Sequence, residues 1–123
     1  MQAFDVVLLQ SDSRVAQCLV SALSPAVASV REVHSLKELR NSIAKHRAGI
    51  AILDMETAPL SEVQTLAHEF PGASIVCTHR CADEEMWTAG LNAGAADVCP
   101  SWDTRAIVHA ALTSKPSRCA AAA

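Results

Sequence analysis

Four short groups of polar residues follow apolar stretches of this chain and contain the side chains that could do chemistry. Their carboxylate, hydroxyl and guanidinium groups can hold ions and form charge-assisted hydrogen bonds. The groups are Gln10-Ser11-Asp12, Asp54-Met55, Thr78-His79-Arg80 and Pro100-Ser101-Trp102. Whether they can form one site depends on the elements that position them.

Each of these groups ends a stretch that is typical of a strand. Apolar runs and apolar–polar alternation predict strands over residues 5–9, 28–33, 49–53, 73–77 and 96–99. Apolar residues at helical spacing predict a helix after each strand. Ser13 is the expected N-cap of the first helix, with Asp12 as its competitor. Ser35 and Glu38 form a capping box at the start of the second helix. Asp103 is a candidate cap of the last helix, and Gly94 suits a left-handed helix end.

Five strands alternating with five helices predict an α/β fold, in which helices cover both faces of a doubly wound parallel sheet. Ligand sites in such sheets lie beyond the carboxyl ends of the strands. The four polar groups are therefore expected at the same edge.

Length, charge and cysteine content exclude several classes of protein. The chain has 123 residues, a net charge of −3 and no basic stripe, so we expect one domain (residues 1–115) that does not itself bind nucleic acid. The last residues, 116–123, are expected to be disordered or introduced during cloning. No apolar run is long enough to span a membrane, and no secretory signal is evident at the start. The five cysteines are odd in number and lack C-x-x-C spacing, which favours a reducing cytoplasm.

From about residue 4 to residue 112 the chain resembles the receiver domains of two-component response regulators. The resemblance rests on AILDM, which contains Asp54, on IVCT, which ends in Thr78, and on AGAADV before the fifth strand. It implies a flavodoxin-like strand order 2-1-3-4-5 and a signalling role that is not enzymatic. It also implies that Asp54 accepts a phosphoryl group from a histidine kinase. In the family, Mg²⁺ is held by the phosphoacceptor and an acidic pair, while a hydroxyl, here Thr78, and a lysine contact the phosphoryl group.

Two parts of that family site are replaced in this chain. The acidic pair falls on Gln10 and Ser11, with Asp12 at the next position, and the lysine falls on Ser101. A shift of one residue in the alignment would bring Asp12 into the pair. Because Asp54, with Asp12 as a weak second ligand, supplies few carboxylates, we expect Mg²⁺ binding to be weak or absent.

These replacements favour a degenerate receiver that acts through protein–protein contacts, with a histidine kinase, an output domain or a second copy as its partner. A working phosphoacceptor switched by a histidine kinase is the alternative. A thiol or metal sensor that uses Cys77, His79 and Cys81 is a distant alternative, because their spacing matches no zinc signature.

Other positions have narrower predicted roles. Val98 stands where the family has an aromatic switch residue, and it is an interface candidate together with Trp87 and Trp102. Arg80 could supply a replacement cation to an anion near Asp54, although a solvated loop arginine is the simpler interpretation.

Overall fold

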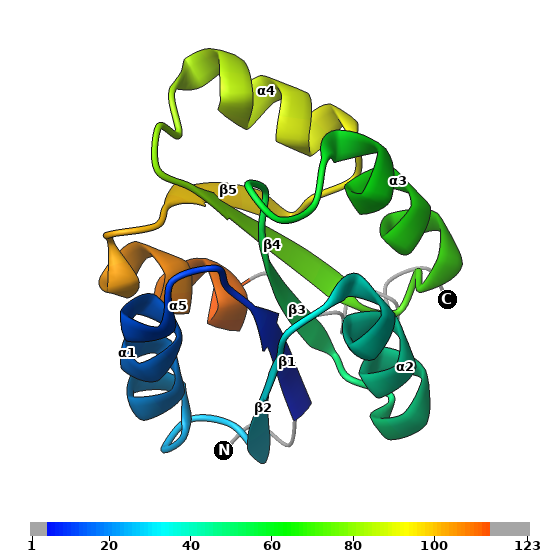
Figure 1. Cartoon of the computed structure of the whole chain (residues 1–123), viewed down its shortest axis with the longest axis vertical. Helices are drawn as coiled ribbons and strands as arrows, with labels where there is room; N and C mark the ends of the chain where they lie inside the picture. Colours follow the sequence, from blue (N-terminus) through cyan, green and yellow to red (C-terminus); the bar gives the residue numbers. More distant parts are fainter. Residues whose placement is uncertain (1–4, 114–123) are drawn as a thin grey trace.

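A five-stranded parallel sheet forms the centre of the computed structural model, which describes residues 5–113. The expected tail at 116–123, including Cys119, lies outside the described residues. The strands are β1 (Asp5–Leu9), β2 (Ser29–Val33), β3 (Ile50–Asp54), β4 (Ser74–His79) and β5 (Asp97–Pro100). Their order is β2-β1-β3-β4-β5, which confirms the predicted doubly wound sheet (Figure 1).

Five helices alternate with the strands along the chain. They are α1 (Ser13–Leu23), α2 (Leu36–His46), α3 (Leu60–Glu69), α4 (Glu84–Asn92) and α5 (Thr104–Thr113). In Figure 1, α1 and α5 lie together on one side of the sheet, while α2 and α3 lie on the other, with α4 beside α3. Helices therefore cover both faces, as the sequence predicts.

Side-chain caps fix several of the helix ends. Ser35 accepts a hydrogen bond from the Glu38 backbone N–H at 3.1 Å, as the capping box predicts. The N-cap of α1 is Asp12, which accepts from the Arg14 N–H at 2.9 Å, whereas Ser13 is the first helical residue. The preference for Ser13 was therefore wrong, because the Asp12 backbone is extended and its carboxylate reaches the exposed N–H groups of the first turn.

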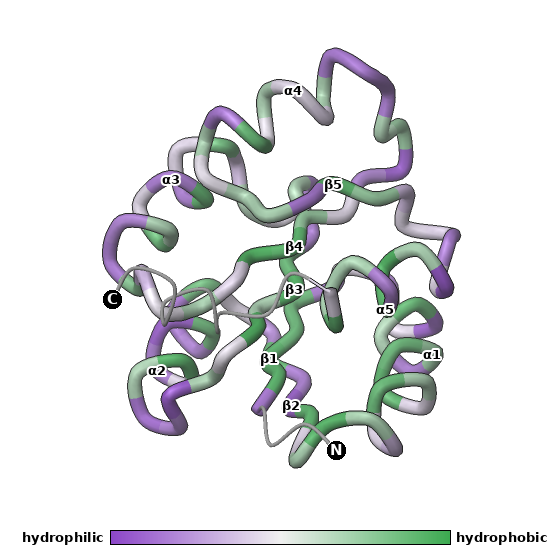
Figure 2. The backbone as a smooth tube through the Cα atoms, turned by 180° about the vertical axis from the view of Figure 1, so that it is seen from behind, coloured by the Kyte–Doolittle hydropathy of each residue, from purple (hydrophilic) through white to green (hydrophobic). Residues whose placement is uncertain are grey.

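The sheet divides the apolar core into two layers. One layer packs β-strand side chains against α1 and α5, and the other packs the alternate side chains against α2, α3 and α4. The central strand β3 is buried along its whole length, and the hydrophobic colour in Figure 2 follows β1, β3 and β4. Burial on both faces explains why these strands have continuous apolar runs.

Two glycines permit close packing near β5. A Cβ at Gly90 would lie 2.3 Å from Cγ2 of Val98, so α4 can approach the strand only without a side chain there. Gly94 has φ +110°, a conformation that L side chains rarely adopt, and it follows the C-cap of α4 as predicted. In the described part of the chain, no helix has the length and apolar character needed to cross a membrane.

Candidate functional site

The strand register brings the predicted polar residues together at one edge of the sheet. Every second side chain of β1 and β3 faces α1 and α5. Gln10 and Asp54 are the next side chains in these two series, so they lie on the same face. Asp54 lies opposite Thr78, which in turn lies opposite Cys99, two residues before Ser101. The four groups therefore share one end of the sheet, as predicted from the parallel direction of the strands.

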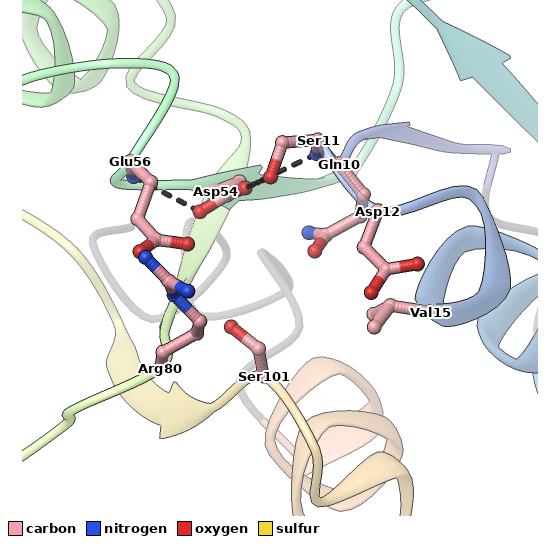
Figure 3. Close-up of a pocket in the computed structure, with 8 residues that line it drawn as sticks. All are labelled: Gln10, Ser11, Asp12, Val15, Asp54, Glu56, Arg80 and Ser101. Atoms are coloured by element: carbon pink, nitrogen blue, oxygen red, sulfur yellow. Dashed lines mark hydrogen bonds and ion pairs between the residues drawn. The ribbon is translucent and has the colours of Figure 1, made fainter.

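Asp54 is 2% exposed, and both of its carboxylate oxygens accept hydrogen bonds from this chain. Ser11 donates twice to Oδ2, from its backbone N–H at 3.1 Å and from its hydroxyl. The Glu56 N–H donates to Oδ1 at 2.9 Å. These contacts come from loops on both sides of the carboxylate (Figure 3).

Gln10 occupies a buried position between the core and the site. Its side chain is 7% exposed, and its Oε1 accepts a hydrogen bond from the fully buried Thr78 hydroxyl at 3.2 Å. The Gln10 Nε2 atom is buried without a hydrogen-bond partner within the described residues. Thr78 therefore contacts Gln10 directly, and one end of the Gln10 amide is left unsatisfied.

An ion pair joins two loops next to Asp54. Arg80 Nε donates to Glu56 Oε2 at 2.6 Å, and Glu56 raises the pKa of Arg80, chiefly through this hydrogen bond. The predicted cation at Arg80 is thus paired with a carboxylate that the sequence interpretation did not include. Glu56 lies two residues beyond Asp54, and its acidic side chain in the loop after β3 was the available signal.

These side chains line a crevice of about 370 Å³ at the strand ends (Figure 3). The lining residues are Gln10, Ser11, Asp12, Val15, Asp54, Glu56, Arg80 and Ser101. The Ser101 hydroxyl is also buried without a partner within residues 5–113. Three carboxylates and one guanidinium give this lining a formal charge of −2.

The carboxylates of the crevice do not form an evident metal centre. Asp54 is hydrogen-bonded at both oxygens, Asp12 caps α1, and Glu56 pairs with Arg80. Across residues 5–113, no group of three or more His, Cys, Asp or Glu side chains could hold a metal ion. The donor set therefore fits Mg²⁺ poorly, since that ion needs near-octahedral oxygen ligands.

The cysteines of the CTHRC segment lie in different environments. Cys77 is buried in the layer beneath α2, α3 and α4, whereas Cys81 is exposed. Burial raises the pKa of the Cys77 thiol to about 12, and Cys99, in the opposite core layer, has a pKa raised to about 11 for the same reason. The His79 Nδ1 accepts from the Cys81 backbone N–H at 3.0 Å, so this segment brings together no set of three converging ligands within the described chain.

The three interface candidates differ in exposure. Trp102 is 74% exposed and Trp87 is 45% exposed, with its indole N–H donating to Asp97 at 3.1 Å. Val98 is 6% exposed and packs in the core next to Gly90. Trp87 and Trp102 are therefore the members of this set that present apolar surface.

The fold is similar to that of response-regulator receiver domains. Solved structures resemble the chain over nearly its whole length, including the signal receiver domain of the response regulator NarL from Mycobacterium tuberculosis. That match has 22% identity and a TM-score of 0.78, and it covers 92% of this chain and 96% of the other. A receiver domain from Bacteroides fragilis matches at 16% identity and TM-score 0.80, covering 91% of this chain and 96% of that one.

A third solved structure is an atypical orphan response regulator, reported to reveal a phosphorylation-independent regulatory mechanism. It matches at 14% identity and TM-score 0.78, covering 89% of this chain and 93% of its own. No protein-family model matches the sequence, and no curated protein matches it either. At these identities, the structural likeness establishes the receiver fold.

Proposed function

We propose that this chain is a receiver-like signalling module that works through protein–protein contacts and does not depend on Mg²⁺-assisted phosphorylation of Asp54. The observation that carries the proposal is the hydrogen bonding of Asp54 by its own chain. Ser11 donates twice to Oδ2 and Glu56 donates to Oδ1. A carboxylate has about four lone-pair sites, and these bonds use three of them, which lowers the nucleophilicity of Asp54 toward phosphorus.

Attack by Asp54 would also bring two anionic groups together in a crevice with little free positive charge. Arg80 is paired with Glu56, and Ser101 stands at the position of the family lysine. Hydrogen bonds to charged groups contribute about 1.5–3 kcal/mol each, so the missing lysine contact weakens phosphoryl binding markedly. The carboxylates Asp12 and Asp54 alone supply too few anionic oxygens to offset this by holding Mg²⁺ tightly.

The atypical orphan regulator among the structural neighbours is reported to have a phosphorylation-independent regulatory mechanism. The mode of action proposed for this chain is likewise independent of phosphorylation. In this chain the exposed indoles of Trp102 and Trp87 offer anchors for a protein partner. The partner would be a kinase, an output domain or a second copy of the chain.

The test is to incubate the protein with Mg²⁺ and acetyl phosphate, or with beryllofluoride, and to record its intact mass and amide NMR spectrum. We expect no phosphorylated mass and no shifts clustered around Asp54. A hydroxylamine-sensitive phosphoryl adduct that Asp54→Asn abolishes would contradict the proposal and support the phosphoacceptor alternative.

A gain-of-function variant provides the matched positive control. Gln10→Asp and Ser11→Asp, combined with Ser101→Lys, place acids and a lysine where the resemblance expects them. If the lost groups are what prevents the chemistry, this triple variant should bind Mg²⁺ and respond to beryllofluoride while the natural chain does not. A response of equal size in both proteins would show that the substitutions at these positions do not matter.

A further inference from the structure

The crevice at the strand ends contains polar atoms that the chain itself leaves unsatisfied. Gln10 is more than nine-tenths buried, yet its Nε2 atom has no hydrogen-bond partner within residues 5–113. The Ser101 hydroxyl is buried without a partner in the same part of the chain. A buried polar group without a partner is unfavourable, so two of them lining one crevice indicate that an occupant satisfies them.

The charge of the lining restricts what that occupant can be. Asp12, Asp54 and Glu56 contribute three carboxylates, and the guanidinium of Arg80 is paired with one of them. The remaining formal charge of −2 repels a free anion and attracts a cation. Asp12 uses one oxygen to cap α1, which leaves its carboxylate at the crevice wall able to accept from an ammonium group.

The two uncharged groups without partners, the Gln10 amide nitrogen and the Ser101 hydroxyl, require a second functional group on the ligand. As oriented, the Gln10 amide presents a donor, which needs an acceptor. If the amide is turned over, so that the nitrogen faces Thr78, it presents an acceptor instead. A hydroxyl satisfies both orientations, because it donates one hydrogen bond and accepts others, and Ser101 can pair with it in the same way.

We propose that the crevice binds a small protonated amine that carries a hydroxyl, a ligand of the amino-alcohol class, with its ammonium on Asp12 and its hydroxyl between Gln10 and Ser101. Figure 3 shows the Gln10 amide and the Ser101 hydroxyl directed toward the open space beside Asp12 and Arg80. A crevice of about 370 Å³ lies in the range of small-ligand pockets. The inference rests on the proposed function, since it assigns to the strand-end crevice a ligand other than Mg²⁺ and phosphoryl.

The test compares three probes by amide NMR at constant pH and ionic strength, with EDTA present to exclude divalent ions. Ethanolamine has both groups, ethylammonium lacks the hydroxyl, and ethylene glycol lacks the charge. We expect saturable shifts with ethanolamine at Ser11, Glu56 and Ser101 and at the Gln10 side-chain amide. Each of the other two probes should bind about tenfold more weakly, because each loses one class of hydrogen bond.

Variants locate the binding groups. Asp12→Asn should weaken ethanolamine up to about fivefold, because Asp12 is exposed. Ser101→Ala should remove the preference for ethanolamine over ethylammonium. Glu69→Gln is the matched control, since Glu69 pairs with Arg40 away from the crevice, and it should leave binding unchanged. Gln10→Leu is a further variant, which removes the buried amide. If Gln10→Leu does not fold, Ser101→Ala still tests the binding of the hydroxyl.

Three results would overturn the inference: no saturable shift with ethanolamine, equal binding of ethanolamine and ethylammonium, or unchanged binding by Asp12→Asn. Because EDTA removes Mg²⁺ and no phosphodonor is present, these results say nothing about phosphorylation. An Asp54 phosphoryl adduct would instead contradict the proposed function, so the two failures are distinguishable.

Discussion

Removing the Ser11 hydroxyl should destabilise the protein by an amount that can be estimated from its contacts. Ser11→Ala deletes the hydroxyl donor to Asp54 Oδ2 but keeps the backbone N–H donor at 3.1 Å and the Glu56 N–H at 2.9 Å. Hydrogen bonds to charged groups contribute about 1.5–3 kcal/mol. Ser11 is exposed, so water can partly replace the hydroxyl, and we expect a loss at or just below the lower end of that range, about 1–1.5 kcal/mol.

Urea unfolding at neutral pH measures this loss as a lower midpoint at unchanged m-value. Ser21→Ala is the control, because Ser21 is an exposed serine of α1 outside the crevice. A cycle with Asp54→Asn isolates the pair, and the coupling free energy should be about 1 kcal/mol. The reasoning is refuted if Ser11→Ala unfolds at the same urea concentration as the Ser21→Ala control.

Three other changes test the packing, the buried thiol and the α1 cap. Gly90→Ala should cost about 1–3 kcal/mol in urea unfolding, because its Cβ would meet Val98 Cγ2 at 2.3 Å, and adding Val98→Ala should recover part of the loss. Burial raises the pKa of Cys77 to about 12, so from about pH 9 to pH 11 the unfolded chain releases a proton that the folded chain keeps. The free energy of unfolding should therefore fall by up to about 1.4 kcal/mol per pH unit in this range. Cys77→Ala should remove that part of the pH dependence. Asp12→Ala should lower stability by about 1 kcal/mol, measured by thermal unfolding, because it removes the acceptor for the Arg14 N–H.

Each of these three predictions has a result that would contradict it. Gly90→Ala without loss of stability would mean that α4 moves away from β5 at little cost. An unfolding free energy with the same alkaline slope in Cys77→Ala would assign the slope to other groups. An Asp12→Ala variant as stable as the natural chain would show that water caps α1 equally well.

Much of the fold was predictable because burial on both faces of a parallel sheet leaves a strong pattern in the sequence. The apolar residues of β3 and the alternation of strands with amphipathic helices predicted the doubly wound parallel sheet, and the resemblance to receiver domains supplied the correct strand order. Strand and helix ends shifted by one or two residues, and the first cap moved from Ser13 to Asp12. Such details depend on local backbone angles that residue type alone does not determine.

Most members of the crevice were predictable, but its contacts were not. Strand ends identified Gln10, Asp54 and Ser101, since parallel strands bring their carboxyl ends to one edge. The pairing of Arg80 with Glu56 could not be predicted, because it joins two loops whose paths depend on tertiary packing. The hydrogen bonds from Ser11 to Asp54 could not be predicted either, because the sequence does not indicate the direction in which a serine hydroxyl points.

The exposure of Trp102 provides an optical probe of the crevice. The chain has two tryptophans and no tyrosine, so its near-ultraviolet emission comes essentially from Trp87 and Trp102. Trp102 is 74% exposed and directly follows Ser101, which lines the crevice. In a Trp87→Phe background, the fluorescence of Trp102 would report on events at the strand ends in real time and without any attached dye.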